Sequence, residues 1–247
     1  MSALSEEELL ALAKPPRTLL QKALARAEEW IYELNAREHP IFRLYDAGNA
    51  LWARLAFRGV RRRLRAFEAR ARTKAGVEAT LRWIEPDEVD ALVALFERFD
   101  FRYLPPHPLD RATVLRVLRS PHCIPLGVYA PGGELIGYSL IRLFFPRRAV
   151  MGIWILASAH ARGLGQICSY ATTWVTRSEG LPNFITIPRD NVASLRVGLW
   201  SGWRILRTNR RFHVLLHDAA SGPPPGSSLE CRFAGGRVLR EEGSEAA

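Results

Sequence analysis

The stretch Trp154-Ile155-Leu156-Ala157-Ser158-Ala159-His160-Ala161-Arg162-Gly163-Leu164-Gly165-Gln166 decides the fold. It begins as an apolar, strand-like run and continues into a turn that contains two glycines. The pattern predicts a strand, a glycine turn and the N-terminus of a helix. The first turn of a helix offers backbone N–H groups without intrahelical partners, and the helix dipole adds partial positive charge there, so this turn can bind an anion. After the turn, the apolar residues fall on one helical face at spacings of three and four: Ile167, Cys168, Ala171, Trp174 and Val175.

A second stretch lies further along, from Arg189-Asp190-Asn191 to Gly202-Trp203. Asp190 is a candidate N-cap, and Gly202 suits the end of a helix before a new strand near Arg204. On these residues alone the stretch is a short helix between two strands. The glycine turn alone could likewise be a plain connection between a strand and a helix.

Together, the two stretches resemble motifs of the GCN5-related N-acetyltransferase (GNAT) family, in the same order. That family binds acetyl-CoA through Gln/Arg-x-x-Gly-x-Gly/Ala at the end of a strand. The run from His160 to Gly165 matches both glycines and departs at the leading residue. The family's later helix opens with Asn and closes with Gly-Phe, and Asn191 with Gly202-Trp203 is similar at matching spacing. The resemblance implies an α/β (α+β) fold with a mixed, mostly antiparallel sheet flanked by helices.

The resemblance also implies how acetyl-CoA, the acyl donor, would be held. The strand backbone at Ile155, Leu156 and Ala157 would pair with the pantetheine arm, and Asn191 would bond the same arm. His160 would border phosphate, as the family's Gln or Arg does. Backbone N–H groups of the turn would hold the pyrophosphate, from Arg162 through Gly163, Leu164 and Gly165 to Gln166.

The resemblance leaves the catalytic residues unassigned. Many family members carry a Tyr on the later helix that protonates the departing thiolate, and Gly198 stands at that position here. The strand at 149–157 contains no acid that could serve as a base. An amine of pKa about 10.4 needs roughly 4.6 kcal/mol of deprotonation at pH 7, whereas one near 7.7 needs about 1. The acceptor is therefore expected to be a low-pKa amine: an amino sugar, a small metabolite or a protein N-terminus. Candidate acceptor residues are Tyr103, His107 and Tyr138, the first two from a loop that the resemblance places at the acceptor site.

The order of elements extends the resemblance over 77–218, with strand, two helices, three strands, helix, strand, helix and two strands. We expect an added N-terminal helical region at 1–76, with helices from about residue 5, over 18–37 and over 51–74. Residues 219–247 read as a Pro/Gly/Ser-rich linker and a mobile tail with at most one short strand.

The composition of the chain limits the kinds of partner that we expect it to bind. The net charge is +10 at neutral pH, which favours anionic partners. Arginines concentrate in 51–74, so we expect a basic helix there. Its basic face is expected to bind RNA or an anionic membrane, or to be merely solvated. Its apolar face is expected to pack on the domain, or on a second copy of the chain in a homodimer. Three widely spaced cysteines favour a reducing cytoplasm and no metal site. No signal peptide and no apolar run of about 20 residues is visible.

Two other functions stay open. The chain could be a degenerate acyltransferase fold that binds coenzyme A or nucleic acid without catalysis, or an acetyltransferase whose acceptor is aminoacyl-tRNA.

Overall fold

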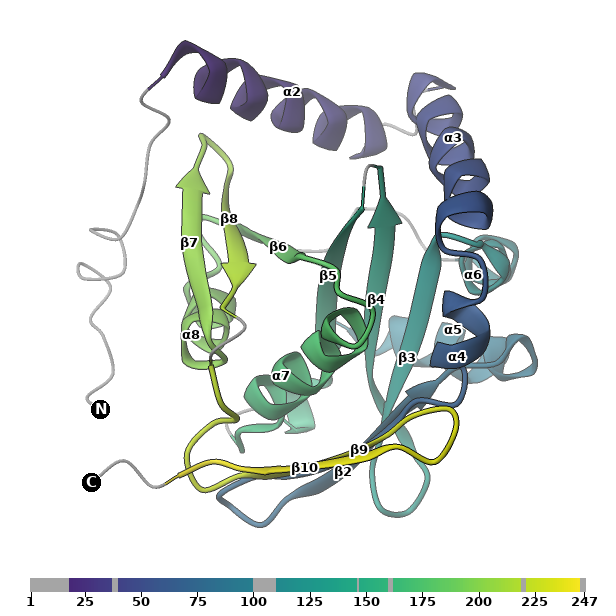
Figure 1. The fold of residues 1–247 in the computed structure, drawn as a ribbon, viewed down its shortest axis with the longest axis vertical. Coiled ribbons are helices and arrows are strands. Elements are labelled where there is room, and N and C mark those ends of the chain that lie inside the picture. Colours follow the sequence, from purple (N-terminus) through teal and green to yellow (C-terminus); the bar gives the residue numbers. More distant parts are fainter. Residues whose placement is uncertain are drawn as a thin grey trace.

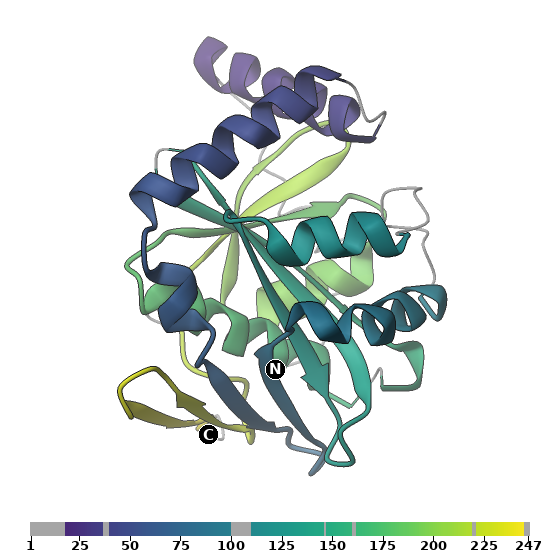
Figure 2. The ribbon, with the colours of Figure 1, turned by 90° about the vertical axis from the view of Figure 1, so that its right-hand side faces the viewer.

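A ten-stranded sheet runs through the molecule in the order β10-β9-β1-β2-β3-β4-β5-β6-β8-β7 (Figures 1 and 2). The computed structural model of the chain describes residues 18–36, 40–99, 110–145, 147–159, 162–218 and 221–244. Within these residues, β5 and β6 pair in parallel and the other neighbouring strands pair antiparallel. The strands are β1 (Glu68–Arg72), β2 (Glu78–Trp83), β3 (Cys123–Tyr129), β4 (Leu135–Phe144), β5 (Arg148–Ile155), β6 (Asn183–Pro188), β7 (Trp203–Thr208), β8 (Phe212–His217), β9 (Ser228–Arg232) and β10 (Val238–Glu242).

Helices cover both faces of this sheet and form two apolar cores. α7 packs on one face, and its core includes Phe67, Leu81 and Ile141. α5 and α6 pack on the other face, where the core includes Leu92 and Leu118. The helices are α2 (Leu19–Ala36), α3 (Pro40–Ala56), α4 (Val60–Leu64), α5 (Val89–Glu97), α6 (Arg111–Arg119), α7 (Leu164–Arg177) and α8 (Val192–Trp200), with short 3-10 helices at Pro86–Glu88 and Ala157–Ala159.

The predicted order of elements over 77–218 is confirmed from β2 to β8, and so is the predicted mixed, mostly antiparallel sheet flanked by helices. α2 confirms the helix predicted over 18–37, whereas the one predicted from residue 5 lies outside the described residues. No described helix combines the length and apolarity needed to cross a membrane.

The helix predicted over 51–74 is wrong for most of its length. α3 ends at Ala56, α4 spans five residues, and Glu68–Arg72 forms a strand. In that strand Ala69 and Ala71 are buried while Arg70 and Arg72 are exposed, which is the two-residue period of a sheet with one face in the core. The strand is held on both sides, because β2 and β9 each pair with all five residues.

The predicted mobile tail is also corrected. Its residues form the hairpin β9–β10, which extends the sheet beyond β1 and runs beside α7 (Figure 1). The hydroxyl of Tyr170 lies 2.7 Å from Oε2 of Glu241, and Trp174 donates its indole N–H to the same oxygen at 3.0 Å. The domain boundaries at 76 and 218 stay a prediction, although the sheet runs across both.

α3 is joined to the sheet by an ion pair between the buried His122 and the partly exposed Asp46. Nε2 of His122 lies 3.0 Å from Oδ1 of Asp46, and Nδ1 of the same ring lies 2.8 Å from the hydroxyl of Ser120. Burial opposes the charge on His122, but the hydrogen bonds to Asp46 and Cys123 outweigh it and raise the pKa of His122 to about 9. His122 is therefore cationic at neutral pH and holds α3 against the start of β3.

This pair predicts a pH-dependent stability. Because the folded pKa of His122 is raised, its contribution is complete below the unfolded pKa near 6.5 and is lost as pH rises through about 9. We expect Asp46→Asn to lower the free energy of unfolding by roughly 2 kcal/mol at pH 6, a figure that allows for the partial exposure of Asp46, and by little above pH 9.5. Urea unfolding of both proteins across this range measures the difference. A difference that stays constant from pH 6 to pH 10 would show that the pair is not ionised.

Candidate cofactor site

β5 and β6 separate along their length. Parallel pairing joins Ala149 to Met151 with Asn183 to Ile185, whereas β5 continues beside β4 as far as Ile155. Beyond Met151 the β5 residues 152–155 are only half-buried. The two strands therefore form a V, whose open edges can take an extended ligand chain by backbone pairing.

The residues predicted for the pantetheine arm lie at the end of β5, and one of them is already engaged. The N–H of Leu156 donates to the carbonyl of Ile136 at 2.9 Å, so it faces β4 and is not available to a ligand. Ala157 is exposed at the start of a 3-10 helix. The backbone of Ile155 and the carbonyls of this segment stay candidates for the predicted pairing.

The glycine turn comes directly after this segment and begins α7. Gly163 is the N-cap of α7, with φ 79° and ψ −2°, a left-handed conformation that glycine adopts at little cost. No described side chain caps this end of the helix. The N–H groups of Leu164, Gly165 and Gln166 precede the first intrahelical bond, which Ile167 donates to the carbonyl of Gly163 at 3.1 Å. His160 lies outside the described residues.

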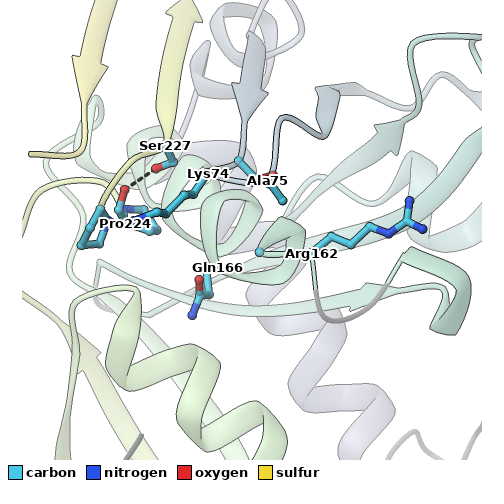
Figure 3. Close-up of a pocket in the computed structure, with 9 residues that line it drawn as sticks. Lys74, Ala75, Arg162, Gln166, Pro224 and Ser227 are labelled. Carbon is cyan, nitrogen blue, oxygen red and sulfur yellow. Dashed lines mark hydrogen bonds between the residues drawn. The ribbon is translucent and has the colours of Figure 1, made fainter. Parts of the chain in front are cut away.

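A pocket of about 250 Å³ opens at this end of α7 (Figure 3). One wall is the β1–β2 turn at Thr73, Lys74 and Ala75, and another is the segment from Pro224 to Ser227. The volume matches a phosphate group and its neighbours rather than a whole coenzyme. The side chain of Arg162 points away from those of Lys74 and Gln166 (Figure 3). The pocket therefore joins a cationic turn to a helix end with open N–H groups.

The sequence reasoning missed these two walls. Residues 73 and 74 were predicted as the end of a helix, with residue 75 just beyond it, and 224–227 were predicted as part of a linker. A signal was present in Gly76, whose φ is 74°, because Lys74-Ala75-Gly76 separates the alternating residues of β1 from those of β2. For Pro224 to Ser227, nothing local in the sequence indicates the packing against α7.

Asn191 is the N-cap of α8, in place of the predicted Asp190. Its Oδ1 accepts a hydrogen bond from the N–H of Ser194 at 3.0 Å. Gly198 is buried further along the helix, where an added Cβ would lie 3.3 Å from Leu215 and 3.4 Å from Ile187. Position 198, where many family members carry a Tyr, is thus a position at which α8 packs closely on β6 and β8.

Asn191 therefore has an observed role as a helix cap and a predicted role as a cofactor contact, and two substitutions separate them. We expect Asn191→Ala to lower the free energy of unfolding by about 1 kcal/mol through loss of the cap, and to weaken acetyl-CoA binding about fivefold through loss of the amide. Asn191→Ser keeps a capping oxygen, so it should restore stability without restoring affinity. Calorimetric titration with acetyl-CoA and thermal unfolding measure the two effects. If Asn191→Ser restores both, the amide does not contact the cofactor.

The candidate acceptor residues are only partly placed. Tyr103 and His107 lie outside the described residues. Tyr138 is buried on β4, with its ring centroid 5.3 Å from that of Phe96 and 5.9 Å from that of Trp154. Burial raises the pKa of the Tyr138 phenol, which therefore stays protonated at neutral pH. Its contact with an acceptor stays a prediction.

Several titratable side chains of β8 and α7 are buried. Burial lowers the pKa of His217 to about 4, and its Nε2 lies 3.1 Å from the carbonyl oxygen of Ser201. Nε2 of His213 has no hydrogen-bond partner among the described residues, while Nδ1 lies 2.8 Å from the hydroxyl of Thr208. Burial raises the pKa of Cys168 to about 12, so this thiol is unreactive. Within the described ranges, no three His, Cys, Asp or Glu side chains are grouped to hold a metal.

Comparison with solved structures identifies the fold. The GNAT domain of PAT from S. lividans aligns with a TM-score of 0.55 at 20% identity, over 61% of this chain and 96% of that domain. The structure of AAC(6')-Ib in complex with paromomycin and acetyl-CoA aligns with a TM-score of 0.51 at 15% identity, over 57% of this chain and 93% of that one. Comparisons with protein-family models and with curated protein sequences gave no match. The fold is that of the GCN5-related N-acetyltransferases, so the fold implied by the two motifs is confirmed.

Proposed function

We propose that this chain is an N-acetyltransferase that moves an acetyl group from acetyl-CoA to a primary amine. The observation that carries the proposal is the V between β5 and β6, with the open first turn of α7 at its base. An extended pantetheine arm needs a free strand edge, and a pyrophosphate needs clustered N–H donors. β6 does not pair with β5 beyond Met151, and the N–H groups of Leu164, Gly165 and Gln166 follow at the start of α7.

In this proposal the phosphates lie at the pocket beside Gly163. The N–H groups of Leu164, Gly165 and Gln166 are placed to donate to phosphate oxygens, and the helix dipole adds to the attraction. Lys74 brings positive charge to the same pocket. The positive φ of Gly163 supports this role, because it turns the chain from β5 into the helix without a Cβ at the mouth of the turn.

Transfer requires a neutral amine that attacks the thioester carbonyl, forms the C–N bond and expels the thiolate. The amine loses one proton in the process, and the thiolate can take one up. Gly198 offers no acid for that step, but a thiol pKa near 8.5 limits the resulting loss to about 2 kcal/mol at pH 7. No acid of β5 can act as base, since the strand contains none. Amines of low pKa are therefore the acceptors that this site suits.

The experiment is turnover of acetyl-CoA, measured as thiol release, against amines with pKa values from about 7.5 to 10.5. At pH 7.5 we expect the rate to rise as the amine pKa falls, because the neutral fraction grows. Calorimetry on the same preparation measures acetyl-CoA binding separately. Binding without turnover on any amine would favour the degenerate, cofactor-binding alternative, which the lack of a Tyr at 198 also supports. Absence of binding would contradict the proposal.

Aminoacyl-tRNA belongs in the same panel, because its amino group has a low pKa and the chain is basic. Acetylation confined to that substrate and suppressed by salt would identify the nucleic-acid acceptor.

A further inference from the structure

α3 carries an apolar stripe that faces solvent. Ile41, Leu44, Leu51 and Leu55 follow one another at spacings of three, seven and four, which places them on one side of the helix. Their exposed fractions are 47%, 73%, 61% and 70%. The opposite side of the helix packs on the sheet through buried residues such as Ala53. α3 therefore has a second apolar face that the described residues leave largely exposed.

The β4–β5 hairpin extends this face. Phe145 is 61% exposed, and its ring packs edge-on against Trp52 with centroids 5.1 Å apart. Tyr45 stacks on Phe144 at 6.1 Å, so the hairpin and the helix meet along one flank of the stripe. α3 lies on the outside of the molecule, across the side that Figure 2 presents to the viewer. We call the four stripe residues together with Phe145 the α3 surface.

Arginines surround the α3 surface. The residues 40–59 and 145–150 contain one acid, Asp46, and that acid is paired with His122 inside the fold. Two arginines belong to the hairpin, and three lie on α3 or just after it. Each of the five side chains is exposed: Arg43, Arg54, Arg58, Arg147 and Arg148.

We propose that the α3 surface binds the face of an anionic lipid bilayer, with its apolar stripe in the headgroup region and its arginines on lipid phosphates. An apolar face bordered by arginines is the pattern of a helix that lies in the plane of a membrane interface. Each arginine near an anionic surface adds attraction, and each inserted leucine adds buried apolar area. The proposal stands apart from acetyl transfer, because none of these residues lines the pocket at α7.

Two other partners fit less well. Nucleic acid would use the arginines, but phosphate contacts give no reason for four exposed aliphatic side chains in a row. A second copy of the chain would cover the stripe, but a symmetric pairing would set the arginine border of one copy against that of the other. The one acid of 40–59 and 145–150 is already paired with His122, so no other carboxylate of these two segments offsets that repulsion.

The experiment is co-sedimentation of the full chain with phosphatidylglycerol–phosphatidylcholine vesicles and with pure phosphatidylcholine vesicles. We expect binding to the anionic vesicles that falls as salt rises, and little binding to the neutral ones. Leu44→Gln with Leu55→Gln, two exposed positions, should reduce partitioning at least tenfold. Arg54→Gln with Arg148→Gln should reduce it by a similar factor. The matched control is Arg204→Gln with Arg237→Gln, exposed positions on β7 and at the β9–β10 turn, which should bind as the wild type does.

Circular dichroism and acetyl-CoA binding on each variant establish that the fold is retained. The proposal is overturned if the wild type does not sediment with anionic vesicles at low salt, or if the leucine variant sediments as fully as the wild type. It is also overturned if the chain binds tRNA in preference to vesicles with no effect of the leucine substitutions. A dimer in solution that the leucine substitutions dissociate would assign the surface to a second copy instead.

Discussion

Gly163→Val should weaken acetyl-CoA binding at least 100-fold. Gly163 ends the V and begins α7 with φ 79°, and an added Cβ would point toward Thr73 at 3.5 Å, across the mouth of the pocket. A valine there disfavours the left-handed conformation and fills space that a phosphate would need. Loss of a charged ligand's hydrogen bonds to several N–H groups accounts for an effect of this size. Calorimetric titration with acetyl-CoA is the measurement.

Gly180 provides the control for backbone strain. It lies just beyond the other end of α7 with φ 65°, and an added Cβ would meet nothing within 4 Å. Gly180→Val should therefore impose a similar strain and lower stability by a similar amount, yet leave affinity unchanged. Wild-type affinity in a folded Gly163→Val protein would remove this turn from the cofactor site.

Gly165 gives a test in which stability and binding change in opposite directions. It lies inside the first turn of α7, and an added Cβ would make ordinary contacts of 3.7 and 3.8 Å with Val197. Gly165→Ala should raise the free energy of unfolding by about 0.5 kcal/mol, because alanine loses less backbone entropy in a helix. Affinity for acetyl-CoA should nevertheless fall about tenfold if phosphate approaches this backbone. Unchanged affinity would place the phosphates farther along the pocket.

The elements from β2 to β8 could be predicted because their signals are local. Strands β4 and β5 alternate or run apolar between turn residues, and α7 keeps its apolar face at helical spacing. β1 could not be predicted in this way, since alanine and arginine are good helix formers and fill 69–72. Its strand conformation comes from pairing with β2 and with β9, which follows about 160 residues later. Tertiary pairing overrode local propensity.

The same difference between local and long-range signals separates the predicted residues of the candidate site from the unpredicted ones. Gly163 and Gly165 were predicted because the strand, the turn and the helix are consecutive. The walls at Thr73–Ala75 and Pro224–Ser227 come from segments far apart in the sequence, and only the β1 and β9 pairings bring them to α7. Asn191 was predicted as a cofactor contact, but its Oδ1 already accepts a hydrogen bond from the N–H of Ser194 in α8.

The arginines of 51–74 show most clearly that local sequence does not reveal the tertiary partners of a side chain. They were predicted to form one basic face that binds an anionic partner or is merely solvated, but five of them have partners within the fold: Arg61, Arg63, Arg65, Arg70 and Arg72. Nη2 of Arg63 lies 2.6 Å from Oε2 of Glu179, and Nη2 of Arg65 lies 3.3 Å from Oε2 of Glu85. The guanidinium of Arg61 donates hydrogen bonds to carbonyls at the end of α6. Substitution of these arginines would therefore remove contacts within the fold as well as contacts with a partner, so the α3 surface is the better place to test binding to an anionic partner.

Arg61→Ala should lower the free energy of unfolding by about 3 kcal/mol. Its guanidinium donates to the carbonyl of Arg119 at 3.1 Å, to that of Leu118 at 2.9 Å and to that of Ser120. These are the last carbonyls of α6, which have no partners within the helix and carry partial negative charge. Cζ of Arg61 also lies 5.1 Å from the centroid of the Trp83 ring. One side chain thus joins α4 to α6 and to β2, and its removal takes a donor from the part-buried carbonyl of Leu118, whereas the carbonyl of Ser120 keeps the N–H of Cys123 at 3.2 Å.

Arg62 is the matched control, because it is the next residue of α4 and its side chain is exposed. Arg62→Ala should change stability by no more than about 0.5 kcal/mol. Arg61→Lys should recover only part of the loss, since a single ammonium cannot donate in a fork to three carbonyls. Urea unfolding of the three variants gives the comparison. If Arg61→Ala and Arg62→Ala unfold at the same urea concentration, the contact with α6 adds nothing to stability, and α4 is held by its buried residues Val60 and Leu64 alone.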